Sequence, residues 1–227
     1  MKSKLKNELH SWTKFEIFWL LFSTLVTVIL SIYWKDNLMG IATALTGIWC
    51  VILTGKGKRS SFLIGLVNVV LYAIVAYKAK YYGEVMLNVL YYLPMGIVGW
   101  FMWKKHMNEE TGEVNKACLP TRMSLILYPA TAGAIVAYGY LLKWMGGKLP
   151  FVDSMSTVIS VVAQILSVFR LAEQWILWIV VDIATVVLWA VNFAQGQENI
   201  ATLIMWSIYL INAFIMYFKW YKESHKA

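Results

Sequence analysis

The chain has 227 residues, of which 60% are hydrophobic and only 14% are charged, and its mean hydropathy is +0.62. A soluble domain is typically about 45–50% apolar and about 25% charged, so this composition excludes a soluble globular protein and indicates a polytopic membrane protein. The net charge of +8 does not predict a nucleic-acid partner, because the basic residues gather at the ends of apolar runs and form no stripe.

Eight apolar runs approach the roughly 20 residues that a helix needs to cross a bilayer. In chain order they are Phe15–Trp34, Leu38–Leu53, Ser61–Tyr77, Val85–Trp103, Ser124–Leu142, Ser154–Phe169, Gln174–Phe193 and Asn199–Phe218. The first run follows a basic leader without a small-residue cleavage site, so we expect a retained span rather than a cleaved signal. The predicted fold is an all-α, polytopic membrane helix bundle in contact with lipid.

Lysines and arginines are distributed unequally between the two sides of the predicted membrane. Fifteen lie on the side of both termini and five on the other side. By the positive-inside rule, both termini are expected in the cytoplasm.

A weak internal repeat has an offset of 117 residues: Tyr72-Ala73 matches Trp189-Ala190, and the pair Trp100 and Trp103 matches Tyr217 and Trp220. Two parallel three-helix repeats require one helix between them, and the fifth span supplies it. Parallel repeats about an axis along the membrane normal are a known transporter architecture. We therefore divide the chain into four parts: 1–37 (tail and extra helix), 38–103 (first repeat), 104–152 (cytoplasmic loop and linker helix) and 153–227 (second repeat and tail).

Asp182 is the most informative single residue, because it lies in the middle of the run Gln174–Phe193. An ionisable group at membrane depth is costly unless it faces a cavity or a partner, so it usually marks a functional site. Trp178 and Trp175 precede it by one and two helical turns and therefore share its face. These three residues outline a buried ligand site, although Asp182 could instead be protonated or paired with an amide.

Other polar or aromatic residues inside the spans are further candidates for binding a ligand. They are Asn68, Asn88, Gln164, Asn192, Asn212 and Trp100. The alternative for each amide is a helix–helix hydrogen bond worth roughly 1 kcal/mol or less. For indoles near the span ends, such as Trp175, the alternative to ligand binding is a place in the aromatic belt at the membrane surface.

The sequence contains no Walker loop, Rossmann glycine fingerprint, HExxH or GxSxG motif. An enzyme that used Asp182 as an acid or base would need a second titratable group, and we expect none of the other acids or histidines deep in a span. The sequence therefore predicts no enzyme, no cofactor and no metal site, and it leaves a secondary transporter, a facilitator or a channel.

Four segments carry a family resemblance: Gly65–Asn68, Gly99–Trp103, Asp153-Ser154, and Glu173–Trp178 followed by Asp182. From about residue 40 to residue 221 the chain resembles the PnuC transporters of nicotinamide riboside and related vitamin precursors. The resemblance implies a SWEET-like bundle, a homotrimer and a bacterial inner membrane. It also implies facilitated diffusion, which becomes one-way because a cytoplasmic kinase phosphorylates the riboside after entry. Where the family pattern often has Asn, this chain has Asp182.

Nicotinamide riboside combines a flat pyridinium cation, a carboxamide and a ribose. A cation over an aromatic face gains roughly 2 kcal/mol or more when desolvated, so Trp178 could stack on the ring while Asp182 balances its charge. Asn and Gln could bond the ribose and the carboxamide. Two alternatives remain: a sugar facilitator of the SWEET type, and a proton-coupled transporter of another nucleoside-like or vitamin substrate.

Overall fold

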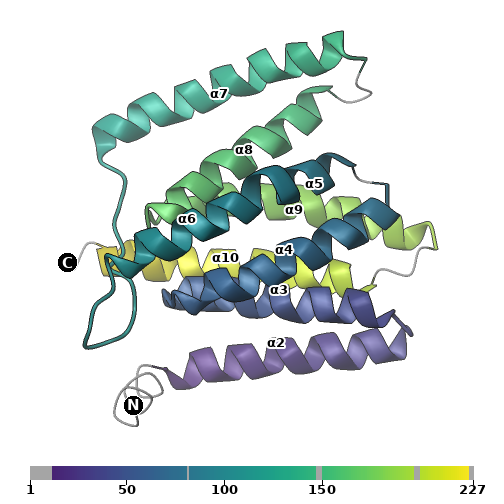
Figure 1. The fold of residues 1–227 in the computed structure, drawn as a ribbon, viewed down its shortest axis with the longest axis horizontal. Helices are drawn as coiled ribbons and strands as arrows, with labels where there is room; N and C mark the ends of the chain where they lie inside the picture. Colours follow the sequence, from purple (N-terminus) through teal and green to yellow (C-terminus); the bar gives the residue numbers. More distant parts are fainter. Residues whose placement is uncertain (1–11, 81, 147–149, 197–199, 225–227) are drawn as a thin grey trace.

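The computed structural model describes residues 12–80, 82–146, 150–196 and 200–224, and these residues are almost entirely helical (Figure 1). The helices are α2 (Lys14–Tyr33), α3 (Leu38–Lys56), α4 (Ser60–Lys78), α5 (Tyr82–Met86), the π-helix η1 (Leu87–Tyr92), α6 (Leu93–Lys104), α7 (Thr121–Trp144), α8 (Pro150–Val168), α9 (Gln174–Ala194) and α10 (Ile200–Ser224). Within the described residues, eight segments are long and apolar enough to cross a membrane, with α5, η1 and α6 together forming one of them over Gly83–Lys104. The predicted all-α membrane bundle is confirmed.

The observed helices follow the predicted spans to within a few residues at most ends. The largest difference is at the end of α10, which continues to Ser224 instead of stopping at Phe218. The predicted start of that span, Asn199, lies outside the described residues. Hydropathy misses such an extension because Lys219, Lys222 and Glu223 are polar, although they continue the helix beyond the apolar run.

Helix α2 begins and α10 ends at the same end of the bundle (Figure 1). We call this the basic end, because Lys56, Lys104 and Lys222 lie in the last turns of helices that finish there or close to it. The far end of the bundle is called the opposite end. The predicted cytoplasmic side corresponds to the basic end.

Five helix contacts organise the bundle. Helix α3 packs against α4, α9 against α10, α3 against α10, and α8 against α6 and α9. Helices α2 and α7 lie at the two margins, where α2 packs on α3 and α10 while α7 packs on α8 (Figure 1). Helix α2 is held partly by the bond from Trp19 Nε1 to Asn212 Oδ1, at 3.2 Å.

Residues separated by 117 positions contact each other at both ends of the bundle. Toward the opposite end, Trp189 Nε1 donates to the Tyr72 hydroxyl at 3.3 Å. Toward the basic end, the rings of Trp103 and Trp220 have centroids 6.1 Å apart. In a twofold arrangement, equivalent residues touch each other only near the axis. These two contacts are therefore what an axis along the bundle between parallel repeats would produce.

Residues 105–120, which we call the basic-end loop, connect α6 to α7 and bond to the turns on both sides of it. Val114 N–H donates to Gly57 O at 2.8 Å, in the turn between α3 and α4. Ala117 bonds through its N–H to Arg170 O at 3.0 Å and through its O to the Ala172 N–H at 2.9 Å, in the turn between α8 and α9. The loop thus joins parts of the chain that belong to the two predicted repeats.

Buried ion pairs reinforce the same end. The Lys56 ammonium lies 2.8 Å from Glu16 Oε2 on α2 and 2.8 Å from Glu113 Oε1 in the basic-end loop, and its side chain is only 4% exposed. Lys219 on α10 also pairs with Glu16. A buried charge is tolerated when such partners surround it, so this network fixes α2 and the loop against the bundle.

Candidate functional site

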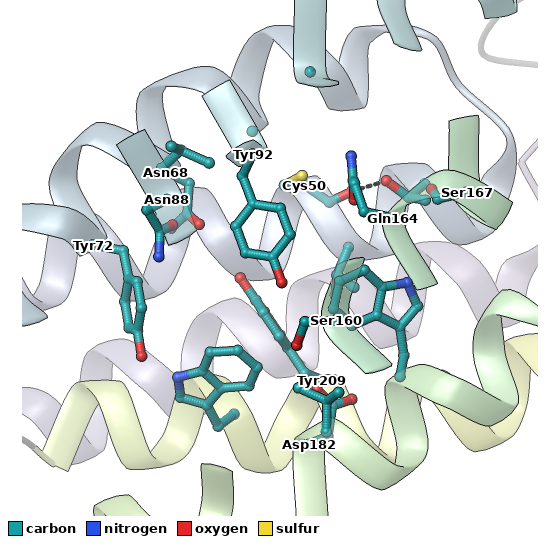
Figure 2. A pocket seen from close by; sticks show the side chains of 18 of the residues that line it. Cys50, Asn68, Tyr72, Asn88, Tyr92, Ser160, Gln164, Ser167, Asp182 and Tyr209 are labelled. Atoms are coloured by element: carbon teal, nitrogen blue, oxygen red, sulfur yellow. Dashed lines mark hydrogen bonds between the residues drawn. The ribbon is translucent and has the colours of Figure 1, made fainter. Parts of the chain in front are cut away.

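A cavity lies between the helices of the two predicted repeats, and Figure 2 shows side chains that line it. Its walls come from α3, α4, the α5–η1–α6 segment, α8, α9 and α10, and none of its lining residues belongs to α2 or α7. The cavity is therefore enclosed by the six spans that the sequence assigned to the repeats.

Helix α9 provides the wall that the sequence singled out. Trp175, Trp178 and Asp182 all line the cavity, so the shared face predicted from their spacing is observed. Asp182 is 3% exposed, and its carboxyl group makes no hydrogen bond or ion pair with any residue that the structure describes. A buried carboxyl group without a protein partner can interact with a ligand that carries a cation or hydrogen-bond donors.

Aromatic rings face this wall. The rings of Tyr92 and Trp178 have centroids 6.2 Å apart, with their planes inclined by 44°. Figure 2 shows Tyr92 and Tyr209 entering the cavity between Asn88 on one side and Gln164 on the other. Several π-faces therefore lie close to the single carboxyl group of α9, an arrangement suited to a flat cation.

The π-helix η1 places Asn88 and Tyr92 on the cavity wall. Pro94 lies two residues after the end of η1. A proline has no N–H to donate to the carbonyl of Leu90, and its ring would clash with that carbonyl in a regular α-helix. Widening into a π-helix relieves this conflict, and such segments are frequent at functional sites. The amide of Asn88 is oriented by a bond from its Nδ2 to Glu84 O at 2.8 Å.

Asn68 and Gln164 reach the cavity from α4 and α8. Both hydrogens of the Asn68 amide are used inside the protein, because Nδ2 donates to Thr43 O at 2.7 Å and to Thr46 Oγ1 at 3.3 Å. Its Oδ1 atom therefore remains to accept a hydrogen bond.

Three predicted site residues do not line this cavity. Asn192 is buried elsewhere on α9. Asn212 accepts from Trp19 and donates from Nδ2 to Val51 O at 3.4 Å, which is the helix–helix alternative raised for such amides. Trp100 lies beneath the Arg59 guanidinium, 3.9 Å from the ring centroid. A role for these three in binding a ligand stays a prediction.

Glu84 is a cavity residue that sequence reasoning missed. Glu84 lies in the first turn of α5, at the end of the span Gly83–Lys104 and not deep in it, yet it lines the same cavity as Asp182. Its side chain forms no hydrogen bond or ion pair with the residues that the structure describes. The missed signal was its position one turn before Asn88, which places both on one helix face.

Gly47 provides a test of how tightly the cavity walls are packed. A Cβ at this position would lie 2.1 Å from the Tyr209 hydroxyl, 2.7 Å from Met205 Sδ and 2.9 Å from Asn68 Nδ2. We expect Gly47→Ala to displace these walls and to destabilise the fold by about 1–3 kcal/mol, as overpacking does. Thermal unfolding measures the effect, with Gly133→Ala as the control, because a Cβ there meets nothing within 4 Å. Equal stability of the two variants would contradict the close packing.

Fold and site together define a polytopic membrane protein with a ligand-sized chamber between two sets of spans, which is the architecture of a carrier. The family model described as "Nicotinamide mononucleotide transporter" matches residues 37–222. Among curated relatives, the "Nicotinamide riboside transporter PnuC" of Neisseria mucosa is 42% identical over 96% of this chain and 85% of the relative. The Haemophilus influenzae protein of the same description is 34% identical over 98% of this chain and 96% of its own length.

A solved structure agrees with these relatives. The "Crystal structure of the Vitamin B3 transporter PnuC" has a TM-score of 0.89 and 40% sequence identity, and it covers 99% of this chain and 98% of that chain. The chain belongs to the PnuC family of membrane transporters, as its motifs indicate. The match spans α3 to α10, and the structural likeness includes α2 as well.

Proposed function

We propose that this protein carries nicotinamide riboside across the membrane, binding it in the chamber between the two sets of spans. One observation carries the proposal: indole and phenol rings, a carboxyl group without a partner among the described residues, and several amides line the same cavity. Each group matches one part of the ligand. The rings suit the pyridinium face, Asp182 its charge, and the amides its carboxamide and hydroxyl groups.

The chamber distinguishes a riboside from a mononucleotide. No Lys, Arg or His is present among the described residues that line it, whereas two acids, Glu84 and Asp182, are. A phosphate brought into this space would lose its hydration and gain no cation, which is costly at low dielectric. The riboside therefore fits the site better than the mononucleotide after which the family model is described.

Purified protein is accordingly expected to bind nicotinamide riboside at least 100-fold more tightly than nicotinamide mononucleotide, a difference of about 2.7 kcal/mol. Isothermal titration calorimetry with each ligand measures this ratio directly. Equal affinity for the two ligands would remove this account of selectivity, and undetectable binding of the riboside would overturn the proposed function.

We infer that transport is facilitated diffusion by alternating access, with the two repeats moving against each other around the chamber. The contacts between residues 117 apart support this arrangement, because they lie where an axis between the repeats would run. The excess of Lys and Arg at the basic end supports a cytoplasmic location of both termini. By family resemblance we further propose a homotrimer in a bacterial inner membrane that supplies a cytoplasmic riboside kinase.

Two alternatives can be separated by experiment. A sugar facilitator would bind glucose in competition with nicotinamide riboside, while Asp182 and the cationic ligand argue against a neutral sugar. The second alternative, proton-coupled uptake of a related substrate, is favoured by the presence of two acids in the chamber. In proteoliposomes, a pH gradient would drive accumulation in that case, whereas a facilitator only equilibrates its substrate.

A further inference from the structure

The chamber is asymmetric along the bundle. Figure 2 places Tyr72 and Asn88 on one side, Gln164 and Ser167 on the other, and Tyr92 and Asp182 between them. Tyr72 contacts Trp189 near the far ends of α4 and α9, so its side of the chamber faces the opposite end of the bundle. The ring-binding residues are therefore central, and different polar groups occupy the two sides.

Glu84 belongs to the side that faces the opposite end. It precedes Asn88 by one turn, and the cavity that both residues line also contains Tyr72 and Tyr92. Tyr92 follows Glu84 by eight positions, which corresponds to a rise of at most roughly 12 Å, because part of this segment is the π-helix η1. A nucleoside lying lengthwise with its base beside Tyr92 would therefore bring its sugar toward Glu84.

Apart from the Tyr72 hydroxyl, which accepts from Trp189 and keeps its own hydrogen to donate, the hydrogen-bonding groups on this side are mainly acceptors. Asn68 has used both amide hydrogens on Thr43 and Thr46, and Asn88 has used one on Glu84 O. The Glu84 carboxyl group has no partner among the described residues. A ligand that matches this side must supply donors, and the vicinal hydroxyls of a ribose supply two. Carboxylates bind ribose hydroxyls in this way in dinucleotide-binding folds.

We propose that Glu84 is a specificity-determining residue that binds the vicinal 2′- and 3′-hydroxyls of the substrate's ribose. This inference rests on the proposed function. The ring then lies between Tyr92 and Trp178, the pyridinium charge lies near Asp182, and the carboxamide points toward Gln164. The ribose faces the opposite end, so the substrate occupies the chamber in a single orientation.

The repeat itself does not impose this orientation. The residue 117 positions after Glu84 is Ala201, and the residue 117 positions before Asp182 is Gly65. Each acid is therefore present in one repeat only. In the repeat-related orientation, the ligand would meet Ala201 and Gly65 in place of the two carboxyl groups, and neither residue has a side chain that can form a hydrogen bond. A ligand turned end for end would lose its ribose partner.

The test uses Glu84→Ala and two ligands that share the cation but differ in the sugar: nicotinamide riboside and N1-methylnicotinamide. Loss of a charge-assisted hydrogen bond is expected to weaken riboside binding by about 10- to 100-fold. Binding of N1-methylnicotinamide, which has no ribose, should change less than about twofold on that scale. Equal weakening of both ligands would show that Glu84 acts through charge alone, and unchanged riboside affinity would equally overturn the proposal.

A second comparison uses the 2′,3′-dideoxy analogue of the riboside. Wild-type protein should prefer the riboside to this analogue by the same 10- to 100-fold, whereas Glu84→Ala should bind both equally. A preference that persists in the variant would assign the hydroxyls to other residues. The comparison also decides the matter if wild-type protein holds N1-methylnicotinamide too weakly to measure.

Matched variants guard against indirect effects. Glu110→Ala removes an exposed carboxylate of the basic-end loop and should leave both affinities unchanged. Glu84→Gln keeps the volume and one acceptor oxygen, so it should lie between wild type and Glu84→Ala, and it replaces the alanine variant if that protein does not fold. Failure of wild-type protein to bind the riboside at all would refute the proposed function rather than the role of Glu84.

Discussion

Trp178→Ala is expected to weaken the binding of nicotinamide riboside by about 30-fold or more, because a desolvated cation over an indole face gains roughly 2 kcal/mol or more. Trp178 lines the chamber and lies next to Tyr92, so its removal leaves the pyridinium with one fewer π-face. Calorimetry on the purified variant measures the change. Size-exclusion chromatography should show the same oligomer as wild type, since the side chain faces the chamber.

The control is the same substitution at an indole outside the chamber. Trp144 ends α7 and is 84% exposed, so Trp144→Ala removes an equal volume without touching the site. We expect its affinity for the riboside to match that of wild type. Unchanged affinity in Trp178→Ala, or an equal loss in both variants, would rule out stacking on Trp178.

Asp182→Asn is expected to weaken the binding of the cationic riboside by about 10-fold, because the amide removes the negative charge beside the pyridinium but keeps the hydrogen-bonding capacity that relatives with Asn at this position also have. The amide retains the size of the carboxyl group but cannot balance the pyridinium charge. The effect should depend on the charge of the ligand. The reduced, dihydropyridine form of the riboside is neutral, and its affinity should fall by much less.

Asp153→Asn is the matched control, because Asp153 lies exposed at the start of α8 and the substitution leaves the chamber unchanged. Binding of the oxidised and reduced ribosides to wild type, Asp182→Asn and Asp153→Asn gives a complete comparison. If Asp182→Asn weakened both forms equally, the carboxyl group would have a structural or hydrogen-bonding role instead of balancing charge.

The spans could be predicted closely from sequence, because crossing a bilayer requires a fixed length of apolar helix and the chain has little freedom in meeting that requirement. The face shared by Trp175, Trp178 and Asp182 could also be predicted, since it follows from helical spacing alone. The π-helix was not anticipated. Its cause, Pro94, is visible in the sequence, but whether a helix kinks, ends or widens at a proline depends on what packs around it.

The sequence alone does not determine which of the buried amides line the chamber. Asn68 and Asn212 look alike in sequence, each lying inside an apolar span, yet one lines the chamber and the other joins α10 to α2 and α3. The difference is set by which neighbour each helix face meets, and this depends on tertiary packing. Glu84 was missed for a related reason: lying close to Lys78 and Lys80, it resembles an interfacial charge until the bundle encloses it.

The basic-end loop has a consequence for how substrate leaves. Its main-chain bonds to Gly57 on one side and to Arg170 and Ala172 on the other must break, or the loop must travel with one partner, before those two turns can separate. In the proposed alternating-access cycle, release of substrate on that side would therefore require these main-chain hydrogen bonds to break, in addition to any rotation of side chains. A longer basic-end loop should change the transport rate and leave the equilibrium affinity for the substrate unchanged.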